Sequence, residues 1–291
     1  MGPQSGITAI PDIAGALSEA DQVALRRAKH QLESPPLGMK LAAIVGAPVE
    51  KMIARLPTVA SDKVNEATQA ALRKCLQIAL KTLGKGGAGA TAPNGEGGAP
   101  ATKPSNLLHK FAVATTGAAG GAFGLFALPV ELPVTTTLMF RSICDIARSE
   151  GEDLASPGTQ LQCLTVFGMG GRSTVDDEAD FGYFIVRGAL AQAVSKASSE
   201  MATKGFAAQG STALLKLMQT IAARFSVQVS EQVAAKSIPA IGAVLGAMVN
   251  TVFIDHFQNV AHGHFTVRRL ERQYGEAAVQ DAYEAIDVSL D

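Results

Sequence analysis

Two stretches of this chain carry no charged side chain, and they limit what it can fold into. The first covers residues 111–130 and the second covers residues 237–254. Twenty helical residues span about 30 Å, which is the thickness of a bilayer core. Ala, Gly and Thr dominate the first stretch, however, so its insertion into lipid would be marginal. A buried helix pair inside a soluble bundle is the other interpretation, and the polar Glu131 and Asn250 favour it.

Both stretches contain glycines spaced four residues apart. This G-x-x-x-G spacing lets a second helix approach closely. The pairs are Gly117 with Gly121, Gly120 with Gly124, and Gly242 with Gly246. We therefore expect the two stretches to form helices that pack against each other.

Helical periodicity extends over the rest of the chain. Ser18, with Asp21 three residues later, predicts a helix start, and the prolines at 35 and 36 predict its end. Apolar residues recur at helical spacing again from Ser61 to Gly84. No segment of the sequence alternates with the period of two that marks a strand. The sequence therefore predicts an all-α fold, a multi-helix bundle with two central glycine-rich apolar helices.

Charge and cysteine content argue against several classes of protein. The 25 basic and 26 acidic side chains nearly cancel, so no net field favours nucleic acid as a partner. Three widely spaced cysteines indicate neither a disulfide framework nor a zinc site. The N-terminus lacks the pattern of a secretory signal, so we expect a cytoplasmic location. Charged residues make up only 18% of the chain, which favours close helix packing or contact with a membrane.

A run rich in Gly, Ala and Pro interrupts the helical pattern at residues 85–104. It predicts a flexible linker or a long surface loop. This linker separates amphipathic helices in residues 1–84 from a larger helical core in residues 105–291. Its GKGGAGAT sequence lacks the order of a phosphate-binding loop, because Lys85 precedes the glycines. We expect no nucleotide and no other cofactor.

Polar residues follow the first uncharged stretch. The LPVELP sequence predicts a break between two helices, and Pro133 predicts the start of the second helix, which runs to Gly151. One face of this helix carries a polar line made of Thr137, Arg141, Asp145 and Arg148. Glu131 precedes Pro133, where a carboxylate meets the positive end of the helix dipole. These residues are either an ion-pair ladder with a capping acid or part of a catalytic site.

The second uncharged stretch leads into Asp255, His256 and His262. Asp255 and His262 share one helix face, whereas His256 points about 100° away. These spacings match no common helical metal site, so we expect no metal, and Asp255 with His262 is only a weak candidate pair. An acid–base enzyme would need its titratable groups in one pocket. The candidate catalytic residues are Glu131, Arg141, Asp145, Asp255 and His256.

Several blocks of the sequence resemble the EcsC protein family. They are LPVELPVTTTLMFRSICDIARSEGEDL, QCLTVFGMGG and KSIPAIGAVLGAMVNTVFIDHFQNVAHGHFTVRRLERQYG, in that order. The resemblance runs roughly from Asp21 to Tyr283. The positions that match recurrent family motifs are Glu131, Pro133, Arg141, Asp145, Gly151, Asn250, Asp255, His256, Phe265, Arg268, Arg269 and Glu271.

The resemblance implies where the protein acts but not which reaction, if any, it catalyses. The family is named after a protein encoded beside an ABC transporter that is linked to secretion and processing of exported proteins, and it brings no agreed catalytic residues. Together with the uncharged stretches, it favours a membrane-associated helical accessory or interaction protein, peripheral at the inner membrane. The expected partner is a membrane surface or a membrane protein. The alternative functions are an uncharacterised enzyme and a soluble carrier of an apolar small molecule or lipid.

Overall fold

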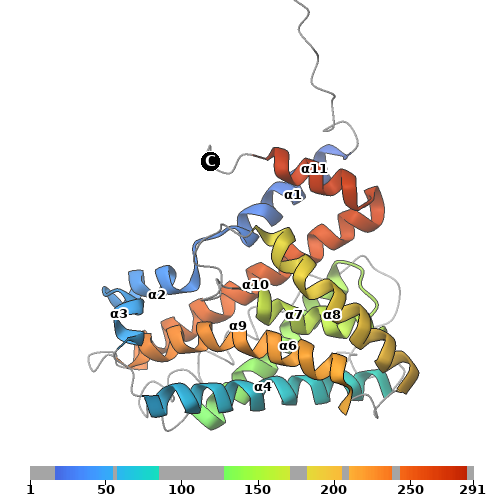
Figure 1. Ribbon diagram of the computed structural model, residues 1–291. Coiled ribbons are helices and arrows are strands. Elements are labelled where there is room, and N and C mark those ends of the chain that lie inside the picture. Colours follow the sequence, from blue (N-terminus) through green and yellow to red (C-terminus); the bar gives the residue numbers. More distant parts are fainter. Residues whose placement is uncertain are drawn as a thin grey trace, which may run out of the picture.

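The computed structural model describes residues 17–54, 58–84, 128–170, 182–204, 210–237 and 243–286. Within these ranges the chain forms ten helices and no strand. The helices are α1 (Glu19–Leu32), α2 (Leu37–Val45), α3 (Val49–Ile53), α4 (Thr58–Gly84), α6 (Leu128–Ser149), α7 (Pro157–Met169), α8 (Tyr183–Lys204), α9 (Thr212–Lys236), α10 (Ala243–Tyr274) and α11 (Glu276–Ala285). The prediction of an all-α bundle is confirmed (Figure 1).

Local sequence signals account for several helix ends. Ser18 caps α1, because its Oγ accepts the backbone N–H of Asp21 at 3.2 Å and donates to the Asp21 carboxylate at 2.7 Å. α1 ends at Leu32, before the two prolines that predict its stop. α4 begins at Thr58, three residues earlier than the sequence predicts, and ends at Gly84 as expected.

The predicted helix break between Leu128 and Pro133 is wrong, because α6 already begins at Leu128 and continues through Pro133. A proline this close to the N-terminus removes only one intrahelical hydrogen bond, the one to the carbonyl of Pro129. Leu128 and Leu132 are one turn apart and both buried. Their burial against the core stabilises the first turn in spite of the proline.

α6 and α10 run parallel and side by side. Three side-chain hydrogen bonds link pairs of residues whose numbers differ by 116. They join Gln258 to Ser142, Thr266 to Glu150 and Arg268 to Glu152. Ser142 lies in α6, and Glu150 and Glu152 follow its last residue; the constant offset means that the two helices run in the same direction. Both helices therefore begin at the same end of the pair.

α10 is the central helix of the bundle, in contact with α1, α2, α6, α7, α9 and α11. Its Phe253 and Phe257 pack with Phe167 of α7 and Phe225 of α9, with neighbouring ring centroids between 4.9 and 6.1 Å apart. The same apolar core includes buried side chains of α2 and α4. Helices α2, α3 and α4 therefore share one core with α6 to α10.

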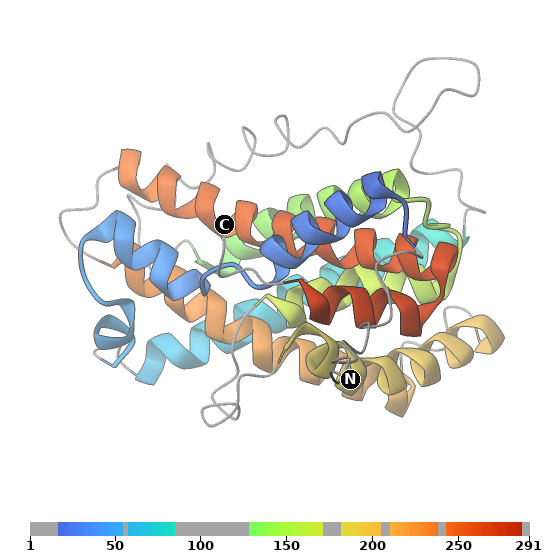
Figure 2. The same cartoon turned by 90° about the horizontal axis from the view of Figure 1, so that it is seen from above.

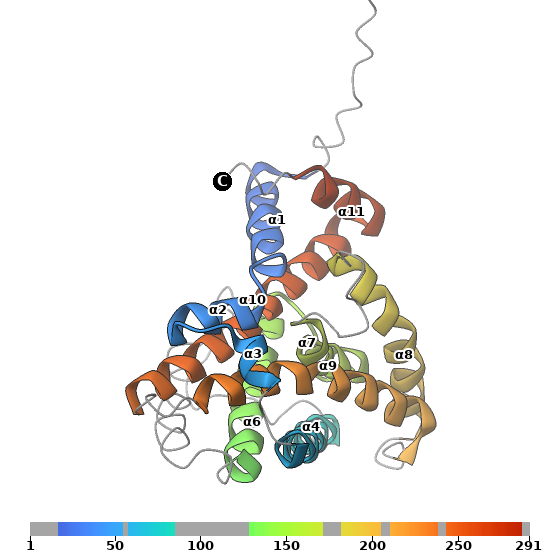
Figure 3. The same ribbon diagram turned by 60° about the vertical axis from the view of Figure 1, so that its left-hand side comes forward.

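A smaller apolar cluster holds α1 and α11 against the C-terminal half of α10. Its buried members are Leu17, Leu25, Ala28, Tyr183, Val267, Leu270, Val279 and Tyr283. Figures 1 and 3 show α1 and α11 together on one side of the bundle, away from α4, and Figure 2 shows α1 lying along α10. Lys29 links α1 to α11, because its Nζ donates a hydrogen bond to the Tyr283 carbonyl at 2.9 Å.

Most of the predicted glycine packing lies outside the described residues. This applies to Gly117, Gly120, Gly121, Gly124 and Gly242, and also to the linker at 85–104. Gly246 is described, and it is buried on α10. The packing of two central glycine-rich helices stays a prediction.

One glycine does control a helix contact in the described residues. A Cβ atom at Gly263 of α10 would lie 2.6 Å from Leu32 Cγ and 2.9 Å from the Ala28 carbonyl oxygen, both in α1. These distances are shorter than a packed interior tolerates. Only glycine therefore lets α1 approach α10 this closely.

Replacing Gly263 with alanine is expected to lower the free energy of unfolding by about 1–3 kcal/mol, because α1 must shift to make room. Gly188 of α8 is the matched control: it is helical and exposed, and no atom lies within 4 Å of its Cβ position. Gly188→Ala is expected to stabilise the protein by about 0.5–1 kcal/mol. Urea unfolding followed by circular dichroism measures both effects. Two stabilising substitutions would contradict the close approach of α1.

Candidate functional site

Exposed apolar side chains lie where α6 and α10 begin. Val130 and Val134, one turn apart on α6, are 73% and 45% exposed. Val244 and Met248, one turn apart on α10, are 76% and 46% exposed. Since the two helices run in the same direction, both pairs lie toward the same end of the helix pair. We call these four residues the apolar end; exposed apolar groups that gather in this way typify interaction surfaces.

The polar groups next to the apolar end are paired with one another. Glu131, in the first turn of α6, binds Lys236 at the last residue of α9, with 2.5 Å between Oε1 and Nζ. This pair places a carboxylate at the positive end of α6 and an ammonium group at the negative end of α9. Asn250 of α10 accepts a hydrogen bond from Gln232 of α9 at 2.6 Å. These contacts fasten α9 to the start of α6 and α10.

The other two candidates on α6 lie far from Glu131. Asp145 is fourteen residues further along the helix, which is about 21 Å along its axis. It pairs with Arg148 at 3.3 Å, in line with the predicted ion-pair ladder. Arg141 lies between them on the helix and is exposed to solvent. The structure therefore does not gather the five candidate catalytic residues in one pocket.

Asp255 and His256 lie at the middle of α10, where α2 and the end of α7 meet it. His256 Nε2 donates to the carbonyl of Gly170, and its Nδ1 lies 3.4 Å from Nζ of Lys40. Lys40 also donates to Ser34 Oγ at 2.9 Å. Burial lowers the pKa of His256, the hydrogen bond to Gly170 opposes this effect and the charge of Lys40 adds to it, so that the pKa is about 4. His256 is thus neutral near pH 7, with both ring nitrogens engaged.

The amine of Lys40, next to this histidine, has a shifted pKa. Burial lowers its pKa, and the negative charge of Asp255 opposes that effect. Asp255 and His262 are both half-buried on α10. Among the described residues, no group of three or more His, Cys, Asp or Glu side chains is placed to hold a metal ion.

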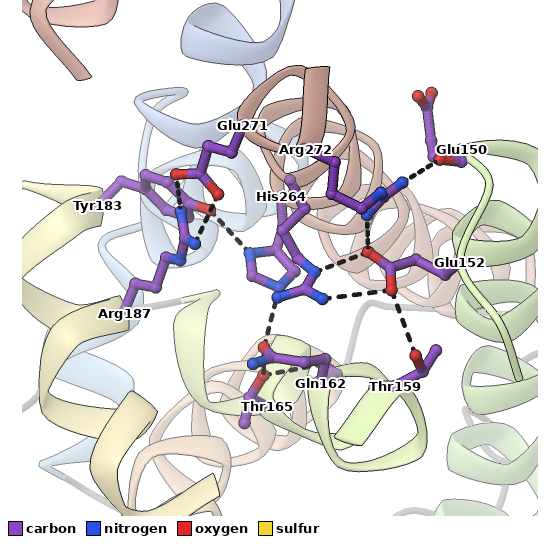
Figure 4. Close-up of polar contacts among 11 residues, drawn as sticks. Glu150, Glu152, Thr159, Gln162, Thr165, Tyr183, Arg187, His264, Glu271 and Arg272 are labelled. Atoms are coloured by element: carbon purple, nitrogen blue, oxygen red, sulfur yellow. Dashed lines mark hydrogen bonds and ion pairs between the residues drawn. The ribbon is translucent and has the colours of Figure 1, made fainter. Parts of the chain in front are cut away.

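A second set of polar residues meets where α6 ends, beside the C-terminal half of α10 (Figure 4). Glu152 accepts from Arg268 Nε at 2.8 Å, from Arg272, and from the hydroxyl of Thr159 at 3.2 Å. Burial raises the pKa of Glu152, but the two arginines outweigh it, so the pKa falls below its ordinary value. Arg272 also donates to the Glu150 carbonyl at 2.6 Å. We call this set the arginine–carboxylate network.

Tyr183 and His264 continue the network toward α8 (Figure 4). The Tyr183 hydroxyl lies 2.8 Å from His264 Nδ1, and His264 Nε2 lies 3.2 Å from Gln162 Oε1. Because an amide oxygen only accepts, Nε2 carries the proton and Nδ1 accepts from Tyr183. Burial holds the pKa of His264 well below its ordinary value. Arg187 and Glu271 complete the set with a two-point ion pair at 2.5 and 2.7 Å.

This pairing indicates a structural role for the network. Each of its charges faces an opposite charge or a hydrogen-bond partner, which is how a folded protein retains polar groups in its interior. The contacts connect α7 and α8 and the turn after α6 to α10. Of the residues singled out in the sequence, Arg268 and Glu271 fall here, whereas Glu152, Tyr183 and His264 were missed. The one local signal was the spacing of Arg268 and Arg272, which places both on one face of α10.

A family model described as the EcsC protein family matches residues 19–270. The chain belongs to the EcsC protein family. The EcsC match begins with α1 and ends inside α10, so it includes the apolar end and most of the arginine–carboxylate network. Comparisons with curated proteins and with solved structures gave no match. Among the described helices of this EcsC protein, none combines the length and the hydropathy needed to cross a membrane.

Two carboxylates meet at the first turn of α2. Glu231 Oε1 of α9 and Glu50 Oε1 of α3 lie 3.0 and 3.5 Å from the position that a Cβ atom would take at Gly38. Burial raises the pKa of Glu231, the charge of Glu50 adds to the increase and a hydrogen bond from the Gly38 N–H opposes it, so that the pKa is about 7. Ionisation of Glu231 therefore weakens the attachment of α2 and α3 to α9.

Glu231→Gln is expected to remove this pH dependence. The pKa of Glu231 is higher in the folded protein than its ordinary 4.5, so its favourable contribution is complete below pH 4.5 and is lost as the pH rises through about 7. The variant should equal the wild type near pH 4.5 and exceed it by about 2–3 kcal/mol in unfolding free energy near pH 8. Urea unfolding across this pH range measures the difference.

The unfolding free energies of variant and wild type are subtracted at each pH. This is necessary because the buried neutral His256 and His264 make the folded protein less stable as the pH falls. Glu66→Gln, at an exposed position of α4, is the control and should leave the pH profile unchanged. An unfolding free energy difference for Glu231→Gln that is the same at pH 4.5 and pH 8 would show that the two carboxylates do not interact in this way.

Proposed function

We propose that this EcsC-family protein is a helical accessory protein that docks on a membrane surface through the apolar end. The observation that carries the proposal is the parallel alignment of α6 and α10. It brings two pairs of exposed apolar side chains, Val130 with Val134 and Val244 with Met248, toward the same end of the helix pair. Both helices also continue sequence stretches without charge.

The energy available from these side chains suits reversible attachment. Full burial of a valine or methionine contributes about 1.5–3 kcal/mol, so four partly exposed ones would contribute on the order of 4 kcal/mol. That is the range of peripheral association, well below that of a spanning helix. The described helices lack a membrane span, and the proposal therefore rests on surface attachment.

Charge placement supports a lipid surface over a charged partner. α10 carries no charged residue before Asp255, and the only charge of α6 before Arg141 is Glu131, which is paired with Lys236. A surface of this kind offers nothing to an acidic or basic patch of a protein. We therefore infer apolar contact with the lipid, peripheral at the inner membrane, and we expect attachment to depend little on salt or on anionic lipid.

Vesicle sedimentation tests the proposal. The full chain is expected to sediment with vesicles of phosphatidylcholine alone, and equally with vesicles that also contain phosphatidylglycerol at 0.5 M salt. Val244→Glu is expected to reduce the bound fraction at least fivefold, since a carboxylate at this position must enter the lipid interface. A wild-type chain that stays in the supernatant with both vesicles would refute membrane docking.

Ile185→Glu is the matched control for the apolar end. Ile185 is a large apolar residue of α8 that is 55% exposed, but it lies away from the start of α6 and α10. Its substitution is expected to leave the bound fraction unchanged. Equal losses in Val244→Glu and Ile185→Glu would mean that the attachment does not use the apolar end. Unfolding curves of both variants confirm that they fold.

A further inference from the structure

A groove lies between α4 and α9, which run side by side (Figure 1). It has a volume of about 520 Å³. Its floor is apolar and consists of buried side chains from both helices: Leu72, Leu76, Leu214 and Met218. On the α4 side it extends from Asn65 to Gln77, which is about 18 Å along the helix. The volume falls in the range of sites for small organic ligands.

The charge at the rim of the groove comes from Arg73. Among the described residues that line the groove, it is the one charged side chain, and none of them is a carboxylate. The other polar lining groups are side-chain amides and one hydroxyl, from Asn65, Gln69, Gln77, Gln219 and Ser226. Arg73 is exposed at the mouth, one residue after Leu72 on the floor. The groove thus combines an elongated apolar floor with one cation at its edge.

We propose that this groove binds a single-chain amphiphile with an anionic headgroup, of the class of a long-chain fatty acid. The alkyl chain would lie along the leucines and Met218, and the headgroup would pair with the Arg73 guanidinium, which matches a carboxylate with two donors. Amides along the rim supply further donors without repelling a negative charge. The site is separate from the apolar end, and the inference does not depend on membrane docking.

The size of the groove favours a chain-like ligand over a partner helix. A helix with its side chains is about 10 Å wide, which is as wide as the spacing between the axes of two packed helices such as α4 and α9. Such a helix would rest on the rim and leave the floor unfilled, which forfeits most of the contacts with the buried leucines. An alkyl chain is narrow enough to reach them.

Displacement of a fluorescent fatty acid from the delipidated full chain tests the site at pH 8. Oleate is expected to bind in a one-to-one complex, and Arg73→Gln should weaken oleate binding about fivefold, the range of one exposed ion pair. Oleyl alcohol, which has the same chain and no charge, should bind both proteins equally. Lys74→Gln is the matched control, because Lys74 is the neighbouring exposed cation on α4 and does not line the groove. It should bind oleate like the wild type.

Ala223→Phe provides a second variant with little effect on folding, since Ala223 is an exposed residue of the groove wall. Its added ring is expected to block both oleate and oleyl alcohol. Vesicle sedimentation of Arg73→Gln should remain at the wild-type level, which separates this site from the apolar end. The inference is overturned if the wild type does not bind oleate, if Lys74→Gln weakens binding as much as Arg73→Gln, or if Ala223→Phe binds normally.

Discussion

The parallel pairing of α6 and α10 is the constraint on which the other features depend. Gln258 of α10 donates to Ser142 of α6 in the buried middle of this contact, at 2.7 Å. A slip by one turn would separate these polar groups and leave them unpaired in the interior, which costs more than their bond contributes. Further along, Glu152 and Arg268 repeat the same register. The two helices therefore pack in one register. This register determines which side chains meet at each end of the helix pair.

At one end, this alignment collects exposed apolar side chains beside a paired Glu131 and Lys236. At the other end, it collects the arginine–carboxylate network, where buried charges are mutually neutralised. The buried histidines are kept neutral and engaged in hydrogen bonds, since burial disfavours their charged forms. A polar core of this kind stabilises one packing of α7, α8 and α10. It suits a scaffold that presents surfaces, namely the apolar end and the groove between α4 and α9.

Much of the fold was predictable because it follows from local rules. The cap at Ser18 and the stop at Gly84 depend on nearby residues alone. The start of α6 was not predictable from Pro133, because burial of Leu128 and Leu132 outweighs the lost hydrogen bond. Tertiary packing overrides a local preference wherever a core surface is available to the competing conformation.

For the candidate site residues, too, some properties follow from the sequence and others only from the tertiary structure. By itself, the sequence determined that the chain is helical and that two stretches lack charge, since composition and periodicity are properties of the chain. The order of its motifs also determined that it resembles the EcsC family. Only the tertiary structure decided that Glu131 pairs with Lys236, 105 residues away, and that Asp145 lies far from it. It also decided that His256 faces Lys40, 216 residues away. Such contacts depend on how helices pack, and helical spacing within one segment carries no information about its partner in another.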